Sequence, residues 1–506
     1  MLASSCTIPR FDVIDYAVIA AYLIAMVALG AVFARRQRSL KEYFHASASL
    51  PWWAVGISLL ATSLSPITYL ASPGWIFLKD SRTTAVSTLL GLSMVPVAAA
   101  IWLPLWSRLR VMSIYEYLES RYHPSIRAFG AFLFLMGTVF WMGTALVTAG
   151  LGFERVTQFD GRWCLAVMVV LGTAYTVLGG MRAVIWTDVA QFLIFIVGYA
   201  AILVVVLALF DFEPMRIYEI ASTTISQKTG YPHTKLISFE LDPTVEATFW
   251  VILFGRFIGA LTFGSGQISV QRLHATRSRR EMLKSMFGSF LSSMIFLAVA
   301  LPASWGFVAF YAQHPELKAG IEHPDQVMPD FVLRNLPRVF RSLIMAGVLA
   351  ALMSSLDSAI NSMSNVAIND FYRRYLVRHA SEKHLVSAAK IFTVVFGMVL
   401  LVFSLWQFDH GGDTALEKLG KLGNLIASPV ASFFLLGIFF KRTNTLGAVI
   451  GAAAGIAFSV IFNGIPGVLE PRLDWINWMW VGGLATIVNV VIGYAASFLF
   501  PPPRNG

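Results

Sequence analysis

Long apolar stretches alternate with short polar ones along almost the whole chain of 506 residues. A helix of about 20 apolar residues is long enough to cross the ~30 Å hydrocarbon core of a bilayer. We count thirteen such stretches and predict that each is a membrane-spanning helix. They cover residues 13–34, 52–78, 84–107, 128–151, 163–180, 184–209, 247–270, 285–312, 340–367, 386–407, 416–439, 443–464 and 476–500.

The connections between these stretches are short, so we predict an all-α polytopic membrane protein with one transmembrane domain, residues 1–506. The two longest connections, 210–246 and 313–339, each have room for a short surface helix. The composition agrees, because 57% of the residues are hydrophobic and only 13% are charged, whereas soluble domains carry about 25% charged residues.

The net charge of +10 is a topology signal rather than a nucleic-acid-binding patch. Lys and Arg concentrate in alternate connections, such as 107–127, 271–284 and 369–384, while the opposite loops are acidic or mixed. Cytoplasmic loops carry the excess of Lys and Arg in multi-pass proteins. We therefore expect a cell-membrane protein with its amino terminus outside, its carboxyl terminus in the cytoplasm and no nucleic-acid partner.

The stretch 347–370, GVLAALMSSLDSAINSMSNVAIND, is unusually polar for a spanning helix. At 100° per residue, Ser354, Ser358 and Asn361 share one face, and Asp357 lies at its edge. Small polar residues also hold helices together, which is the better interpretation for Ser362 and Ser364. A carboxylate at the midplane costs at least about 2.5–3.5 kcal/mol and usually marks an ion or substrate path. This face is therefore predicted to line such a path.

A second irregular stretch is ATSLSPITYLASPGW, residues 61–75. Pro66 has no N–H, so the carbonyl of Thr62 loses its helical partner. Such breaks are tolerated at membrane depth where a cavity or an ion satisfies the freed groups, although a proline kink without function is also common. The neighbouring hydroxyls of Ser63, Ser65 and Thr68 favour a binding site.

Two further charged residues fall inside predicted spans. Asp188 follows a tight turn at Gly179-Gly180 and could cap or pair near the interface, or serve as a cation ligand. Arg256 lies within 247–270. It could form a structural ion pair with Asp357 or Asp188, or it could recognise an anion, and we expect the ion pair.

Five stretches, in order, resemble motifs of the sodium:solute symporter family, which includes sodium/glucose cotransporters and bacterial proline and sialic acid transporters. They read YFHASASLPWWAVGISLLATSLSPITYLASPGW, GGMRAVIWTDVAQ, SVQRLHATRSRREMLKS, SSLDSAINSMSNVAINDFYRR and LLGIFFKRTNTLGAVIG. The resemblance covers nearly the whole chain and is strongest to the bacterial sialic acid transporters.

The resemblance implies the LeuT-type 5+5 inverted-repeat fold, with the binding site at the midplane. The repeats would be about 52–209 and 247–439, flanked by helices 13–34, 443–464 and 476–500. It also implies a main Na⁺ site formed by the carbonyls of Ala61, Leu64 and Ala351 with the hydroxyls of Ser354 and Ser355.

A further Na⁺ site, present in some family members, would fall on Asp188, Ser354 and Ser358. Asp357 stands where relatives can have serine, and it could bind sodium, accept a proton or neutralise Arg256. For the solute, the resemblance implies contacts with the hydroxyls of Ser63, Ser65 and Thr68. Two further substrate positions differ from relatives: Thr138 replaces the arginine of sialic acid transporters, and Gly266, followed by Gln267, replaces the asparagine of sugar carriers.

These observations predict a sodium-coupled symporter, and not an enzyme, that imports a small organic solute by alternating access. A sugar, polyol or sugar derivative is favoured as the solute, and the carrier is expected to work as a monomer. The alternatives are a symporter of a small carboxylate or amino-acid-like solute, and a membrane sensor of sodium or solute. A membrane enzyme would need a nucleophile–base pair or a metal cluster, and neither motif is present.

Overall fold

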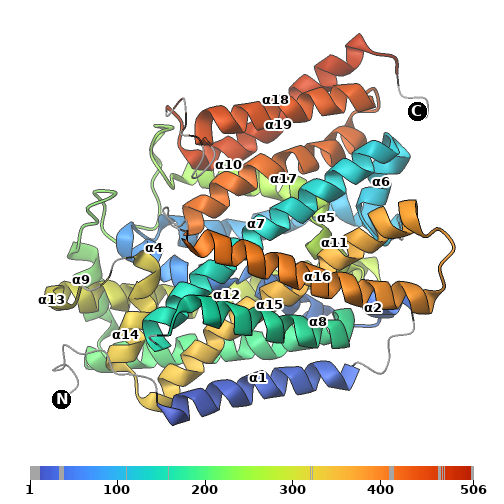
Figure 1. Cartoon of the computed structure of the whole chain (residues 1–506). Coiled ribbons are helices and arrows are strands. Elements are labelled where there is room, and N and C mark those ends of the chain that lie inside the picture. Colours follow the sequence, from blue (N-terminus) through green and yellow to red (C-terminus); the bar gives the residue numbers. More distant parts are fainter. Residues whose placement is uncertain are drawn as a thin grey trace.

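The structure is a computed structural model that describes residues 12–502 except 34–38, 110, 158, 319–320, 322, 410–414, 465–468, 470, 472 and 474. It is a helical bundle, with α1 at one edge and α18 and α19 at the opposite edge (Figure 1). The helices are α1 (Val13–Phe33), α2 (Leu40–His45), α3 (Trp52–Ser63), α4 (Ser72–Leu78), α5 (Arg82–Arg108), α6 (Tyr115–Arg121), α7 (Pro124–Thr157), α8 (Gly161–Leu209), α9 (Pro214–Thr223), α10 (Phe249–Thr262), α11 (Gln267–Leu273), α12 (Arg279–Gln313), α13 (Pro315–Lys318), α14 (Val327–Asn335), α15 (Arg338–Val366), α16 (Glu382–Asp409), α17 (Ala415–Phe439), α18 (Thr445–Asn463) and α19 (Trp478–Ala496).

Each of the thirteen predicted spans lies on a helix or on a bent pair of helices. Nine helices of the described chain are long and apolar enough to cross a membrane, and two bent pairs raise this number to eleven. α8 holds two predicted spans in its 49 residues, which measure about 70 Å at 1.5 Å per residue. It divides at Gly180, where φ is 58° and ψ is −166°, a conformation that glycine adopts readily. The remaining span lies on the shorter apolar part of α17, Leu425–Phe439.

Short helices occur in both long connections, as expected. The connection 210–246 holds α9, and 313–339 holds α13, the 3₁₀ turn η5 (Pro324–Gln326) and α14.

Two of the spans are broken in the middle. The first runs through α3, the π-helical turn η3 (Ile67–Ala71) and α4, and it bends by 69° between Trp52–Ser63 and Thr68–Leu78. The second runs through α10, the 3₁₀ turn η4 (Phe263–Ser265) and α11, and it bends by 65°. The first break lies at the predicted proline, whereas the second, at Gly264-Ser265-Gly266, was not predicted. Each broken span stands at the start of one of the two segments predicted as repeats.

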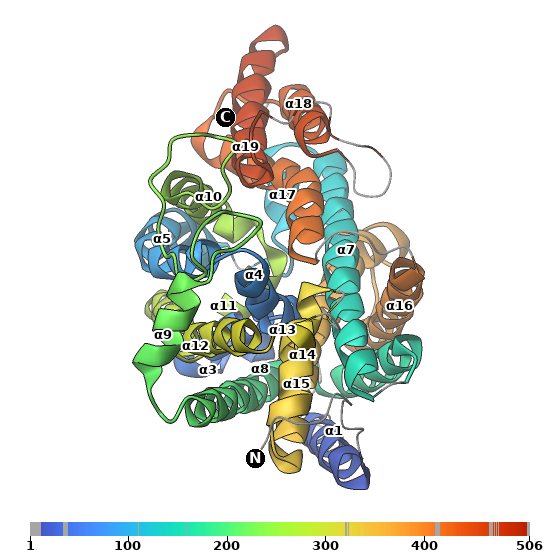
Figure 2. The ribbon, with the colours of Figure 1, turned by 90° about the vertical axis from the view of Figure 1, so that its left-hand side faces the viewer.

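α15 lies in the interior of the bundle. It contacts α1, α3, α7, α8 and α16, and Figure 2 shows it between α8 on one side and α7 and α16 on the other. Every residue from Ile344 to Val366 is buried. Along this stretch both the polar and the apolar faces are therefore covered by protein, so none of its eight polar residues, which lie between Ser354 and Asn365, need face lipid.

The second break depends on close packing at Gly264. A Cβ atom at this position would lie 2.1 Å from the buried ring of Trp102, whose indole N–H donates to the carbonyl of Ala260 at 3.2 Å. We predict that Gly264→Ala lowers the stability of the purified protein by about 1–3 kcal/mol, because the ring must move. Thermal unfolding in detergent measures this effect.

Gly255→Ala is the matched control, because a Cβ atom there meets no atom within 4 Å and alanine is the better helix former. Its melting temperature should stay the same or rise. Equal melting temperatures for Gly264→Ala and Gly255→Ala would contradict this account of the second break.

Candidate functional site

The break after α3 faces the polar part of α15. The carbonyl of Thr62, deprived of its helical partner by Pro66, accepts a hydrogen bond from the hydroxyl of Ser355 at 3.1 Å. Both residues are buried. A cavity or an ion was expected to satisfy this carbonyl, whereas in the structure a serine from a helix nearly 300 positions further along the chain does so.

The predicted main sodium ligands lie around the same contact. The hydroxyl oxygen of Ser354 is 3.1 Å from the carbonyl oxygen of Ala61 and 3.0 Å from that of Ala351. A hydroxyl has only one proton, so it cannot satisfy both carbonyls fully. Leu64 ends α3 with φ −83° and ψ 67° and is buried at the break. Oxygen-only, uncharged ligands of this kind suit a hard cation.

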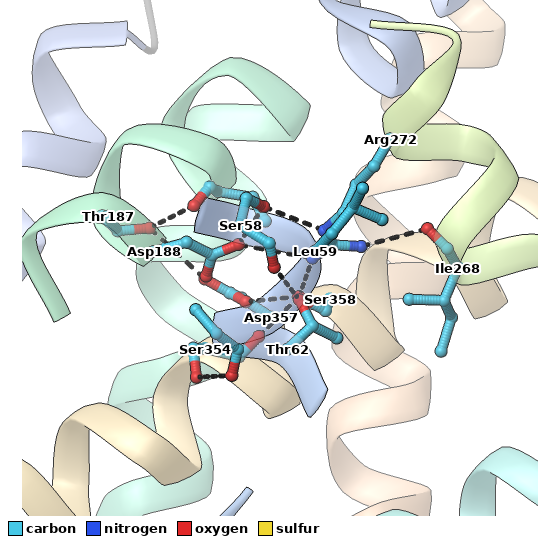
Figure 3. A network of polar contacts seen from close by, with 12 residues as sticks. Ser58, Leu59, Thr62, Thr187, Asp188, Ile268, Arg272, Ser354, Asp357 and Ser358 are labelled. Atoms are coloured by element: carbon cyan, nitrogen blue, oxygen red, sulfur yellow. Dashed lines mark hydrogen bonds and ion pairs between the residues drawn. The ribbon is translucent and has the colours of Figure 1, made fainter. Parts of the chain in front are cut away.

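Beside these oxygen atoms, a buried arginine of one helix contacts side chains of three other helices. Arg272 of α11 lies 3.4 Å (Nη2) from Oδ2 of Asp188 in α8. The hydroxyl of Ser58 in α3 bridges them, because it donates to Asp188 Oδ2 at 2.5 Å and accepts from Arg272 Nε at 2.9 Å. Arg272 Nη2 also donates to the hydroxyl of Ser358 in α15 (Figure 3). The side chains of Arg272 and Asp188 are fully buried.

Asp357 completes this cluster from α15. Its Oδ2 atom accepts from the hydroxyl of Tyr175 at 3.0 Å and lies 3.4 Å from that of Thr187, and its Oδ1 atom lies 3.2 Å from the hydroxyl of Ser358. Arg272 pairs directly with Asp188 and reaches Asp357 only through the hydroxyl of Ser358, so the cluster carries one net negative charge when both carboxylates are ionised. Among the described residues, Oδ1 of Asp188 has no hydrogen-bond partner. The cluster therefore has both the charge and a free oxygen to accept a further cation.

The structure corrects two expectations, one about the location of Arg272 and one about the partner of Arg256. Arg272 was counted in the cytoplasmic connection 271–284, but it lies inside the bundle, because the second break turns α11 back into the core. Asp188, expected as a partner of Arg256, pairs with Arg272 instead. Arg256 makes no ion pair within the described part of the chain. The glycines at 264 and 266 were the signal that could have located the break, and with it Arg272.

The predicted solute residues divide into two groups. Ser63 and Thr68 line a cavity of about 510 Å³ between α3, α4, α5, α10 and α12, and Leu64 also reaches it. Ser65 and Thr138 are buried outside this lining. Gln267 is buried as well, and its Oε1 atom accepts from the backbone N–H of Ile114 at 2.9 Å.

The remaining polar residues of α15 contact neighbouring elements. The hydroxyl of Ser364 donates to the carbonyl of Ala389 in α16 at 2.7 Å, which fits the expected role of holding helices together. Asn361 accepts from Gln271 of α11 at 2.9 Å. The hydroxyl of Ser362 has no hydrogen-bond partner among the described residues.

We predict that Arg272→Gln destabilises the purified protein by roughly 3–5 kcal/mol, because it leaves two buried carboxylates without a counter-charge. The double variant with Asp188→Asn should recover much of this loss, since it restores the net charge of the cluster. Thermal unfolding at a fixed sodium concentration measures both variants.

Arg216→Gln is the control, because Arg216 pairs with Asp211 on the exposed surface, where an ion pair contributes about 0–1 kcal/mol. If Arg272→Gln melts like this control, or if the double variant is as unstable as Arg272→Gln, the shared-arginine account is incorrect.

The chain was compared with known proteins. The family model "Sodium:solute symporter family" matches residues 43–455. The sodium/sialic acid symporter NanT of Aliivibrio fischeri is 29% identical over 499 residues, which cover 98% of this chain and 95% of that protein.

Solved structures agree with the family match. A substrate-bound, outward-open structure of a Na⁺-coupled sialic acid symporter superposes with a TM-score of 0.85 at 26% identity, over 98% of this chain and 100% of the other. Mhp1, a transporter with the LeuT-type fold, gives a TM-score of 0.54 at 14% identity, over 93% and 97% of the two chains, and supports the fold alone. This chain is therefore a multi-pass membrane protein of the LeuT-type fold. It belongs to the sodium:solute symporter family and is a sodium-coupled symporter rather than an enzyme.

Proposed function

We propose that this chain imports a small organic solute together with sodium by alternating access, and that the solute binds in the 510 Å³ cavity beside the first break. One observation carries the proposal. Leu64 lies at the break, where its carbonyl is a proposed sodium ligand, and it also lines the cavity. An ion that fixes the backbone at this residue fixes one wall of the solute site.

The main sodium ion would be bound by the carbonyls of Ala61, Leu64 and Ala351 and the hydroxyls of Ser354 and Ser355. In the structure, the hydroxyls of Ser354 and Ser355 donate to the carbonyls of Ala61 and Thr62 across the gap between α3 and α15. A sodium ion would replace those weak contacts by direct coordination and hold the two helices at one separation. Sodium binding would thereby prepare the cavity for the solute.

A second sodium ion would bind at Asp188, Asp357, Ser354 and Ser358. The net negative charge of this cluster and the unpaired Oδ1 atom of Asp188 support it. Two sodium ions that move down a potential of 100 mV supply ~4.6 kcal/mol for solute accumulation.

For the solute, we retain a sugar, polyol or sugar derivative. The hydroxyls of Ser63 and Thr68 in the cavity support this choice, with Ser65, Thr138 and Gln267 as further proposed contacts in other states of the carrier. A small carboxylate or an amino-acid-like solute is the alternative, and so is a sensor role. We propose a monomer in the cell membrane, with the amino terminus outside and the carboxyl terminus in the cytoplasm.

Proteoliposomes test this function with a panel of labelled sugars, polyols, sugar derivatives and small carboxylates. We expect that one of these classes of solute accumulates, and that it does so only when an inward sodium gradient is present. Ser355→Ala should raise the sodium concentration for half-maximal uptake at least about tenfold, because it removes one oxygen from a small coordination shell.

Ser362→Ala provides the matched control, because Ser362 is a buried hydroxyl of the same helix that has no hydrogen-bond partner among the described residues. It should leave the sodium dependence unchanged. Accumulation without a sodium gradient would contradict the proposed function. Unchanged sodium dependence in Ser355→Ala would show that the main sodium site does not include Ser355.

Asp357→Asn should lower the number of sodium ions coupled to each solute by one, because it removes the net negative charge of the cluster while it keeps the shape of the side chain. The reversal potential of transport at varied sodium concentrations gives this number. A flatter pH dependence with an unchanged sodium number would show instead that Asp357 carries a proton. The wild-type reversal potential in Asp357→Asn would exclude sodium at this residue.

A further inference from the structure

Among the described residues that line the proposed solute cavity, Arg256 is the only charged one. It projects from α10, one of the predicted spans, in the first half of the second broken helix. All the other polar side chains of the lining carry hydroxyl groups, among them Ser63, Thr68 and Thr84. The described lining contains no Asp or Glu, so the cavity has a single positive charge and a ring of hydroxyls.

Among the described residues, no carboxylate forms an ion pair with Arg256. Asp188, one of its two candidate partners, is held by Arg272 and Ser58 instead. A charged side chain at membrane depth is costly and is usually paired or directed to a water-filled path. Arg256 is an exposed residue that lines the cavity, so its guanidinium is accessible to an anionic ligand there.

We infer that the transported solute is a small hydroxylated monocarboxylate, such as a sugar acid, and that Arg256 binds its carboxylate. This inference rests on the proposed function and specifies its solute. The guanidinium presents paired N–H donors that match the two oxygens of a carboxylate. The hydroxyl-lined walls would bind the hydroxyl groups of the solute. One carboxylate balances the single positive charge of the cavity, whereas a phosphate dianion would leave a negative charge buried.

The position that is arginine in sialic acid transporters is Thr138 of α7 in this chain, and Thr138 is buried outside the cavity lining. Arg256 provides the same chemical group from α10. The carboxylate end of the solute would then contact the second broken span, while its hydroxyls contact the first at Ser63 and Thr68.

The test uses the full-length protein in lipid nanodiscs at saturating sodium. Binding of gluconate is compared with that of sorbitol, and binding of glucuronate with that of glucose, so each pair differs mainly by the carboxylate. We expect at least one acid to bind ten times more tightly than its neutral partner. Arg256→Gln should abolish this difference, and Arg256→Lys should keep part of it.

Two measurements show that a loss is specific. Sodium binding without solute should remain normal in Arg256→Gln, which also shows that the variant is folded. Arg216→Gln, which removes an exposed arginine of α9, should bind both pairs like the wild type.

The proposal is overturned if neither acid binds, if acid and neutral partner bind equally, or if the preference survives in Arg256→Gln. The proposed function can stand in each of these cases, because sodium-driven uptake of a neutral solute would preserve it. Conversely, an acid preference that depends on Arg256 but not on sodium would support the binding site and contradict symport.

Discussion

Two buried carboxylates and one buried guanidinium set the arrangement of the helices in the middle of this protein. An unpaired charge in a protein interior costs several kcal/mol, so Asp188, Asp357 and Arg272 must stay together. Arg272 reaches them only because the second broken span bends by 65°. The resulting contacts join α11 to α3, α8 and α15. With both carboxylates ionised, one negative charge would remain uncompensated, and this charge is the physical reason to propose a mobile cation at this place.

The same constraint links ion binding to solute binding. From Ile344 to Val366, α15 is buried in protein, and its serines donate to the carbonyls of Ala61 and Thr62 beside the first break. The other side of that break forms a wall of the cavity. On the proposed function, the two broken spans therefore provide both the oxygen ligands of a sodium ion and part of the lining of the solute cavity. This is the use of irregular backbone that a bilayer permits, because the freed groups face a cavity and not lipid.

The sequence predicted the features that depend on local chemistry. The length of the apolar stretches located the helices. The missing N–H of Pro66 predicted a free carbonyl at Thr62, and the hydroxyl of Ser355 donates a hydrogen bond to it. The role of Arg272 was missed, because in sequence it resembles one more basic residue of an inside loop. Its burial depends on a turn at Gly264 and on partners at positions 58, 188 and 358, and no local pattern reveals such distant pairings. The burial of α15 from Ile344 to Val366 was also hidden, since its apolar residues could equally have faced lipid.

Density for the ion itself shows whether α3 and α15 bind sodium. Cryo-electron microscopy maps of the solute-free protein, one in sodium chloride and one in choline chloride, would be compared at matched resolution. The account predicts a difference peak, present only in sodium, beside the hydroxyl of Ser354 and the carbonyls of Ala61 and Ala351. Identical density in the two maps at this position, with a sodium-dependent peak elsewhere in the bundle, would contradict it.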